Sequence, residues 1–128
     1  MATFPAATGD VLTAAMYNGL VTFTVGADQT ADYTAVLADS YQALVVMNKA
    51  TAVAFKIPTD ASVAFPVGSA ITIYNKGAGA VTVSAVTSGT TTVVSAGAVP
   101  AAPTLAQYKT CVAIKLAANS WTIVGGIA

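Results

Sequence analysis

The chain contains very few charged side chains. Only 8% of its 128 residues are charged; all five acids are aspartate, all five bases are lysine, and glutamate, arginine and histidine are absent. Without histidine the chain cannot build a Ser-His-Asp triad, a Cys-His pair or a histidine-ligated zinc site. With no arginine and a net charge of zero, it has no basic stripe that could follow a phosphate backbone. These absences argue against most hydrolases and against nucleic-acid binding.

Few residues remain that could carry chemistry. The single cysteine, Cys111, has no disulfide partner and no metal-ligating neighbour, so we expect a small buried apolar residue. The aspartates fall in turns or at strand starts, where accepting backbone hydrogen bonds is a commoner role than forming a catalytic carboxylate pair. Asp28 and Asp32 lack the oxygen-dense loop of a calcium site. We therefore predict no catalytic residue, metal, cofactor or small-molecule substrate, and no enzymatic activity.

The abundant residues are apolar, at 55% of the chain, and the mean hydropathy is +0.72. A soluble domain typically carries about 25% charged residues, so this chain has too few charges to coat a monomer. We expect part of its surface to be buried against copies of itself or against a partner. No apolar run approaches the roughly 18 residues of a membrane span, and residues 1–10 lack the features of a signal peptide. We expect no membrane contact, and synthesis in the cytoplasm.

A period of two between apolar and polar residues is clearest in residues 70–83. Two strand-like segments flank the glycine-rich residues 75–79, and their apolar positions are Ile71, Ile73, Val81 and Val83. This pattern predicts a β-hairpin whose glycines supply the positive φ of a tight turn. A glycine turn followed by a strand does not form a phosphate cradle.

The rest of the chain after residue 20 repeats this strand pattern in short segments. Residues 43–47 are apolar throughout, as expected of a strand covered on both faces. Residues 109–115 and 120–124 predict a terminal hairpin, with Trp121 packed over the end of a sheet. Nine or ten short strands without alternating helices indicate an all-β fold, a β-sandwich or jelly-roll-like antiparallel domain over residues 21–128. The pattern leaves a sandwich and a barrel both open.

Residues 1–20 are predicted to form an N-terminal arm with one short helix. Thr8 or Asp10 can cap the helix, apolar residues recur at helical spacing, and Asn18 and Gly19 can end it. The apolar side of this helix is too narrow to form a core. We expect it to dock onto a sheet or a neighbouring subunit.

Several short motifs recur together in one kind of protein. They are Gly9-Asp-Val-Leu-Thr-Ala-Ala15 with Asn18, Tyr33-Thr-Ala-Val-Leu-Ala-Asp39, Val45-Val-Met-Asn48, Ile57-Pro58, Phe65-Pro-Val-Gly-Ser-Ala-Ile71, Gly77-Ala-Gly-Ala-Val-Thr82, and Trp121 with Gly125. Through them the chain resembles structural proteins of tailed-bacteriophage virions, which include fibres and capsid decoration (cement) proteins. The motifs cover nearly the whole chain, and none of them is catalytic.

The resemblance implies a β-sandwich or jelly roll that assembles as a homotrimer on the virion. Because the chain has no long shaft of repeats or heptads, a compact decoration protein fits better than a fibre. It would bind the outer surface of the head and stabilise the shell through non-covalent contacts with the major capsid protein. The expected location is the virion, after assembly in the host cytoplasm.

The contacts with that partner are expected from the arm, residues 2–20, or from the loop of residues 98–105. The candidate contact residues are Phe4, Val11, Leu12, Met16, Tyr17, Val99, Pro100, Pro103 and Leu105. The alternative function is a head- or tail-fibre module that binds a host receptor or glycan, or attaches an adaptor. That alternative predicts exposed aromatic residues, such as Tyr74 or Tyr108, clustered at one end. Tyrosines on sheets are more often half-buried packing residues.

Overall fold

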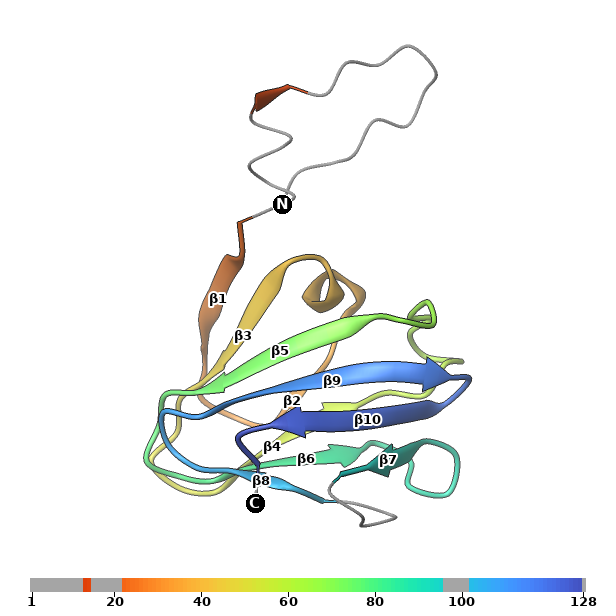
Figure 1. Ribbon diagram of the computed structural model, residues 1–128. Helices are drawn as coiled ribbons and strands as arrows, with labels where there is room; N and C mark the ends of the chain where they lie inside the picture. The colour runs from red at the N-terminus through yellow and green to blue at the C-terminus, as the bar shows by residue number, and fades with distance from the viewer. Residues whose placement is uncertain (1–12, 15–21, 96–101, 128) are drawn as a thin grey trace.

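The computed structural model describes residues 13–14, 22–95 and 102–127, which form an all-β fold of two sheets (Figure 1). The strands are β1 (Thr24–Gln29), β2 (Tyr33–Thr34), β3 (Ala43–Met47), β4 (Val53–Ile57), β5 (Ala70–Asn75), β6 (Val81–Ala85), β7 (Thr92–Val94), β8 (Thr104–Leu105), β9 (Thr110–Ala117) and β10 (Ser120–Gly125), with one short 3₁₀ helix, η1 (Leu37–Ser40). The larger sheet has the order β1-β3-β5-β9-β10-β7, and the smaller sheet β2-β4-β6-β8. Apart from residues 13 and 14, the helix expected over residues 8–20 lies outside the described residues.

The first six strands alternate between the two sheets. β1, β3 and β5 lie in the larger sheet, β2, β4 and β6 lie in the smaller one, and neighbours within each set of three pair in parallel. β3 pairs with β5 and β4 pairs with β6, and in both pairings the partners are always 28 positions apart in the sequence. Val45 pairs with Ile73, for example, and Phe55 with Val83. Residues 43–57 and 71–85 are therefore two stacked copies of one strand–arch–strand unit.

The hairpin predicted over residues 70–83 is wrong. β5 and β6 do not pair with each other; β5 pairs with β3 and β9, while β6 pairs with β4 and β8. Residues 76–80 form an arch that carries the chain from one sheet to the other. Alternation fixes which side chains point inward, but it does not say whether two consecutive strands face each other across a core or lie side by side.

Gly77 and Gly79 allow this arch to stack closely on the preceding arch, residues 48–52, between β3 and β4. Neither glycine has a positive φ. A Cβ on Gly77 would lie 2.3 Å from the backbone nitrogen of Lys49, and a Cβ on Gly79 would lie 1.9 Å from the carbonyl oxygen of Thr51. The Gly79 N–H donates to the Lys49 carbonyl at 2.9 Å. Backbone hydrogen bonds thus run directly from one arch to the next, and a side chain at either glycine would separate them.

Asn75 is a buried amide that holds the second arch in shape. Its Nδ2 donates to the carbonyl oxygens of Gly79 at 2.9 Å and Leu105 at 2.8 Å, and its Oδ1 accepts from the Gly77 N–H at 3.1 Å. Because each of these partners is a main-chain group, the buried side chain is satisfied by atoms that no substitution removes. The same contacts join the arch to β8.

The predicted terminal hairpin is confirmed, since β9 and β10 pair in antiparallel fashion. β9 also pairs antiparallel with β5, whereas β10 pairs in parallel with β7. Five of the eight pairings between the described strands are parallel, so both sheets are mixed and the expectation of an antiparallel domain is corrected. For the four parallel pairings among β1–β6 the physical reason is the arches, because each complete coil returns the chain to the same sheet in the same direction.

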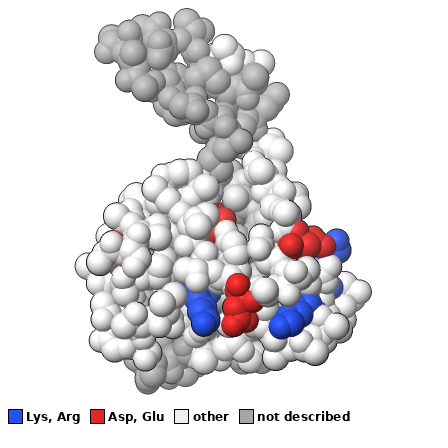
Figure 2. All heavy atoms as spheres, turned by 180° about the vertical axis from the view of Figure 1, so that it is seen from behind, with Lys and Arg blue, Asp and Glu red and all other residues white. Residues whose placement is uncertain are grey.

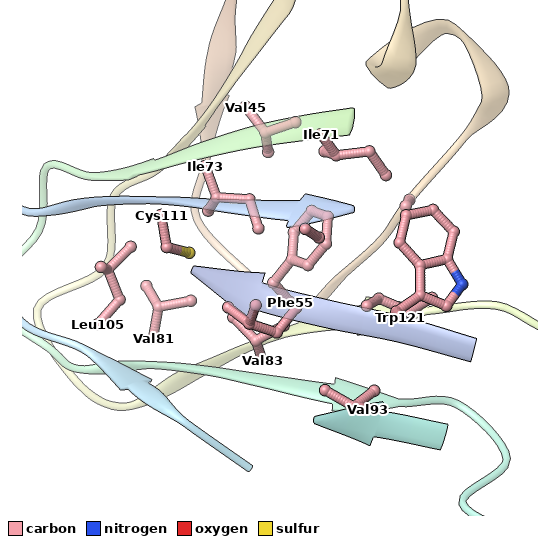
Figure 3. Packing of buried hydrophobic residues seen from close by; sticks show 14 of the residues in the cluster. Val45, Phe55, Ile71, Ile73, Val81, Val83, Val93, Leu105, Cys111 and Trp121 are labelled. Atoms are coloured by element: carbon pink, nitrogen blue, oxygen red, sulfur yellow. The ribbon is translucent and has the colours of Figure 1, made fainter. Parts of the chain in front are cut away.

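The inward side chains of both sheets form one core (Figure 3). The larger sheet contributes Val45, Met47, Ile71, Ile73, Cys111, Ala113, Trp121, Ile123 and Val93, and the smaller sheet contributes Val53, Phe55, Ile57, Val81, Val83 and Leu105. Trp121 is fully buried within this core and meets Phe65 edge-on at 5.3 Å between ring centroids, so it does not cover the end of a sheet. Cys111 is a buried core residue as predicted, and burial raises the pKa of its thiol to about 11.

Lys115 is the charged side chain that the described part of the chain buries, at 4% exposure. Its Nζ lies 2.8 Å from Asp60 Oδ1 and donates to the Phe65 carbonyl at 2.6 Å. Asp60 Oδ2 accepts from the Asn119 N–H at 3.1 Å, and the Asp60 N–H donates to Asn119 Oδ1 at 2.9 Å. The Lys115 hydrogen bond holds the pKa of Asp60 below its ordinary value. This cluster fixes the turn after β4 to the β9–β10 hairpin.

Candidate functional site on the larger sheet

The aspartates at the turns have the backbone roles that the sequence predicts. Asp32 Oδ1 accepts from the Ala54 N–H at 3.0 Å, and Asp39 Oδ2 accepts from the Val36 N–H at 2.9 Å and from the Tyr33 hydroxyl at 2.7 Å. Burial, with the Asp39 hydrogen bond adding to it, raises the pKa of Tyr33 well above its ordinary value. Within the described ranges, no group of three His, Cys, Asp or Glu residues could hold a metal ion. The functional candidates are therefore surfaces.

One row of uncharged residues crosses five neighbouring strands of the larger sheet. Strand register places in this row Val25, Leu44, Thr72, Val112 and Val124. Residues paired across a ladder project to the same side of the sheet, and side chains alternate along each strand. Because the residues next to these in sequence on β3, β5, β9 and β10 belong to the core, the row points outward. Val25 is 68% exposed and Val124 is 46% exposed.

Two further rows flank the first and complete what we call the outer face. One row consists of Ala70, Ile114, Thr122 and Val94, and the other of Asp28, Val46, Tyr74 and Thr110. The outer face is these three rows together. Its members are aliphatic residues, threonines and one tyrosine, of which Val46 is already buried at 4% exposure. Asp28 at the corner beside the arches is the single charged residue in the rows. Such a surface has little to offer a charged ligand.

The charge of Asp28 is already paired within the chain. Asp28 Oδ2 accepts from Asn48 Nδ2 at 2.9 Å and lies 3.2 Å from Lys76 Nζ. Asn48 and Lys76 directly follow β3 and β5, so the three side chains form a ladder across three stacked strands. The Asn48 hydrogen bond, followed by that of Lys76, lowers the pKa of Asp28. The ladder keeps this charge at the arch end of the molecule.

The smaller sheet has a polar outward surface. Its rows consist of Thr34, Lys56 and Ser84, and of Ala54, Thr82 and Thr104. Seen from behind, the lysine and aspartate side chains lie across the middle and right of the body, while the left part is almost free of charge (Figure 2). The outward rows of the smaller sheet thus combine polar side chains with the charged Lys56, a mixture that suits contact with water.

Comparison with family models, with curated proteins and with solved structures finds no match to this chain. Among the residues that the structure describes, no helix has the length and apolar character to cross a membrane. The candidate site therefore rests on the contacts of this chain alone.

The structure places two of the nine candidate contact residues. The other seven lie outside the described residues: Phe4, Val11, Leu12, Met16, Tyr17, Val99 and Pro100. Pro103 is buried, and Leu105 is fully buried in β8, where it pairs with Val81. Neither side chain is available to a partner, so the expectation is corrected for these two. The proline-rich sequence suggested an exposed loop, but Leu105 supplies a core position of the smaller sheet.

Tyr74 and Tyr108 both belong to the arch end of the larger sheet, where the backbone of Tyr108 is hydrogen-bonded to the residue after Tyr74. Tyr108 is 69% exposed with φ at 64°, and its N–H donates to the carbonyl of Asn75, the neighbour of Tyr74, at 2.6 Å. Tyr74 is half-buried on the outer face. Sequence analysis missed the outer face as a unit. Its signal is the absence of charge at the outward positions of β3, β5, β9 and β10, which is recognisable only once the strands are aligned.

Proposed function

We propose that this chain is a capsid decoration (cement) protein of a tailed bacteriophage, a non-catalytic protein that binds the outside of the head as a homotrimer. The motifs that resemble virion structural proteins supply the class. The observation that carries the proposal is the outer face of the larger sheet, whose three rows together extend over all six strands with a single, internally paired charge. A chain with 8% charged residues gains most from burying such a face.

In its side-chain composition, the outer face is similar to surfaces through which one β-sheet packs on another. β-branched side chains standing on a pleated sheet interdigitate with those of a second sheet about 10 Å away. Full burial of a valine or isoleucine contributes about 1.5–3 kcal/mol, and the half-exposed residues here contribute part of that each. Several such residues per copy are needed to offset the roughly 4–15 kcal/mol that association costs. In the proposed trimer, three outer faces turn towards a common axis.

The trimer leaves the polar smaller sheet in water and brings the other contacts to the shell. The arm, residues 2–20, remains the proposed contact with the major capsid protein, because it precedes β1 in the chain and β1 is an edge strand of the larger sheet. A protein that binds the mature shell in preference to its precursor shifts the equilibrium towards the mature form. The stabilisation is non-covalent and requires no cofactor.

The copy number of this chain in purified particles tests the proposal. Quantitative mass spectrometry against the major capsid protein should give a ratio near one copy per shell subunit. As a control, a tail protein of known low abundance in the same particles should give a ratio far below one. A few copies of this chain per particle would contradict decoration of the shell and would favour a fibre or tail component.

A second candidate, a receptor- or glycan-binding fibre module, is favoured by the position of Tyr74 and Tyr108 at one end of the sheet. Gln107, which precedes Tyr108 in the chain, donates from Nε2 to the Lys76 carbonyl at 3.3 Å, so this end of the sheet also has polar groups. A glycan array probed with the full chain tests this candidate. Binding that Tyr108→Ala removes and Tyr41→Ala retains would support it, and no binding to any glycan would reject it.

A further inference from the structure

β1 differs from the other strands at the edges of the two sheets. Among the described strands, the edge strands β7, β2 and β8 have three, two and two residues, whereas β1 has six. Proteins protect sheet edges from unwanted pairing with short strands, lysine or proline. β1 is long, its sequence Thr-Val-Gly-Ala-Asp-Gln contains neither lysine nor proline, and no described strand pairs with its outer side. It is the longest edge strand in the described structure, and its protective features are the register shift between Val25 and Asp28 and the charge of Asp28.

The side chains and the backbone of β1 are both available to a partner. Every residue of β1 except Gln29 is exposed, and Phe23 just before it is 53% exposed. The Thr24 N–H donates to the Gln42 carbonyl, and the Gln29 carbonyl accepts from the Asn48 N–H, so these two residues direct their backbone groups towards β3. Backbone groups alternate along a strand, and a register shift lies between the two ends of β1. The backbone groups of Val25 and Asp28 therefore point away from β3, towards the open edge of the sheet.

We propose that β1 pairs with β1 of a second copy of this chain, in antiparallel fashion about a twofold axis. A twofold axis brings the same strand of two copies together through one self-complementary surface. The antiparallel register sets Val25 opposite Asp28 of the second copy and Thr24 opposite Gln29. A parallel pairing in register would instead place the two Asp28 carboxylates side by side, which is unfavourable.

Continuity with the outer face favours a second copy over a foreign strand. Val25 is the β1 member of the central row, so pairing across the twofold axis joins the rows of two copies in one twelve-stranded sheet. The Asp28 carboxylate keeps its own partners, Asn48 and Lys76, and needs no cation from outside. This contact goes beyond the proposed trimer, and its choice of a second copy rests on the proposed role of the outer face. On a shell, it would link neighbouring trimers to one another.

Two variants of the full chain distinguish the β1 contact from the trimer contact through the outer face. Val25→Pro removes the Val25 N–H at the open edge of β1 but no hydrogen bond to β3. Its matched control, Val25→Thr, keeps this N–H and a β-branched side chain. Val112→Lys places a charge in the centre of the outer face. Native mass spectrometry should show assemblies larger than a trimer for wild type and Val25→Thr, trimers for Val25→Pro, dimers for Val112→Lys, and monomers for the double variant.

Failure of one contact is distinguishable from failure of the other. A wild-type dimer that Val25→Pro converts to monomers and Val112→Lys leaves unchanged would reject the trimer and support the β1 contact. An assembly mass unaffected by Val25→Pro, with an unchanged circular dichroism spectrum, would overturn the β1 contact. If Val25→Pro fails to fold, amide hydrogen exchange of wild type decides, because the Val25 and Asp28 amides should be protected in the assembly and exchange at least tenfold faster on dilution to monomers. Equal exchange in both states would also overturn the proposal.

Discussion

The two sheets share one core but differ in the surfaces that they turn outward. Most inward positions in both sheets are occupied by apolar residues such as Val, Ile and Phe, because both sheets contribute to the same hydrophobic core. Outward, the smaller sheet shows rows such as Thr34, Lys56 and Ser84, and the larger sheet shows rows such as Leu44, Thr72, Val112 and Val124. Folding does not require this difference. It therefore reflects what each face meets: water on the smaller sheet, and on the larger sheet, as we propose, other copies of the chain.

Gly79→Ala should have the largest effect, because both outward surfaces depend on the stacked arches. The new Cβ would lie 1.9 Å from the Thr51 carbonyl oxygen, within backbone that cannot move away without breaking the stack. We expect a loss of at least about 3 kcal/mol in the free energy of unfolding, measured by urea denaturation. Gly89→Ala is the matched control, since nothing lies within 4 Å of its Cβ position. Equal losses for the two variants would contradict the stacking.

Val112→Lys and Thr82→Lys compare the two faces directly. Both residues are half-buried and point outward, one in the centre of the larger sheet and one in the centre of the smaller sheet. We expect Val112→Lys to weaken self-association about a hundredfold, or ~2.7 kcal/mol, and Thr82→Lys to leave it unchanged. Sedimentation equilibrium measures both. If the two variants weaken association equally, the faces do not differ in the way that we propose.

Asp60→Asn tests the charge that the larger sheet holds on its inward side. Removing the carboxylate leaves the buried Lys115 ammonium without its anion, so we expect a loss of about 1–2 kcal/mol in the free energy of unfolding. Asp28→Asn is the control, because its partner Lys76 is 53% exposed and a surface pair contributes little. Thermal unfolding at neutral pH measures both. A larger loss for Asp28→Asn would contradict the burial argument.

The same pair predicts a dependence of stability on pH. The pKa of Asp60 is lowered in the folded state, so the unfolded chain binds the proton more tightly. This contribution to stability is fully present above the ordinary aspartate pKa of about 3.9, and it is lost as the pH falls through that value towards the lower folded pKa. Urea unfolding between pH 6 and 2.5 should show a decline that is shallower in Asp60→Asn. Parallel curves would argue against the cluster.

Tyr33→Phe should have the smallest effect. It removes the hydroxyl that donates to Asp39 at 2.7 Å but keeps the ring, which packs 5.9 Å from that of Phe55 between centroids. We expect a loss of about 1 kcal/mol or less by urea denaturation, and no change for Tyr41→Phe on the exposed surface. A loss equal to that of Asp60→Asn would show that the edge of the smaller sheet is more tightly coupled to the core than its exposure indicates.

The sequence predicted the all-β class, the terminal hairpin, the buried Cys111 and the backbone hydrogen bonds of Asp32, Asp39 and Asp60. The same prediction is wrong for Asp28, which lies within β1 and accepts from side chains, and Asp10 lies outside the described residues. Alternation could not assign partners, because side-chain period fixes a face and says nothing of the neighbouring strand. The stacked repeat has a signal that alternation alone does not use: at an offset of 28 residues, Val45 aligns with Ile73 and Val53 with Val81. The outer face depends on that alignment. Most of the predicted contact residues lie outside the described structure, so the proposed contact of the arm with the shell stays a prediction.

The constant offset of 28 residues has a consequence for how such a chain can grow. Duplicating one whole unit would add one strand to each sheet and about 4.8 Å to the stack, while every inward residue stays inward. An insertion of a single residue within a strand would instead exchange the faces of all that follows it in that strand. Lengthening by whole units is therefore the change that preserves both surfaces.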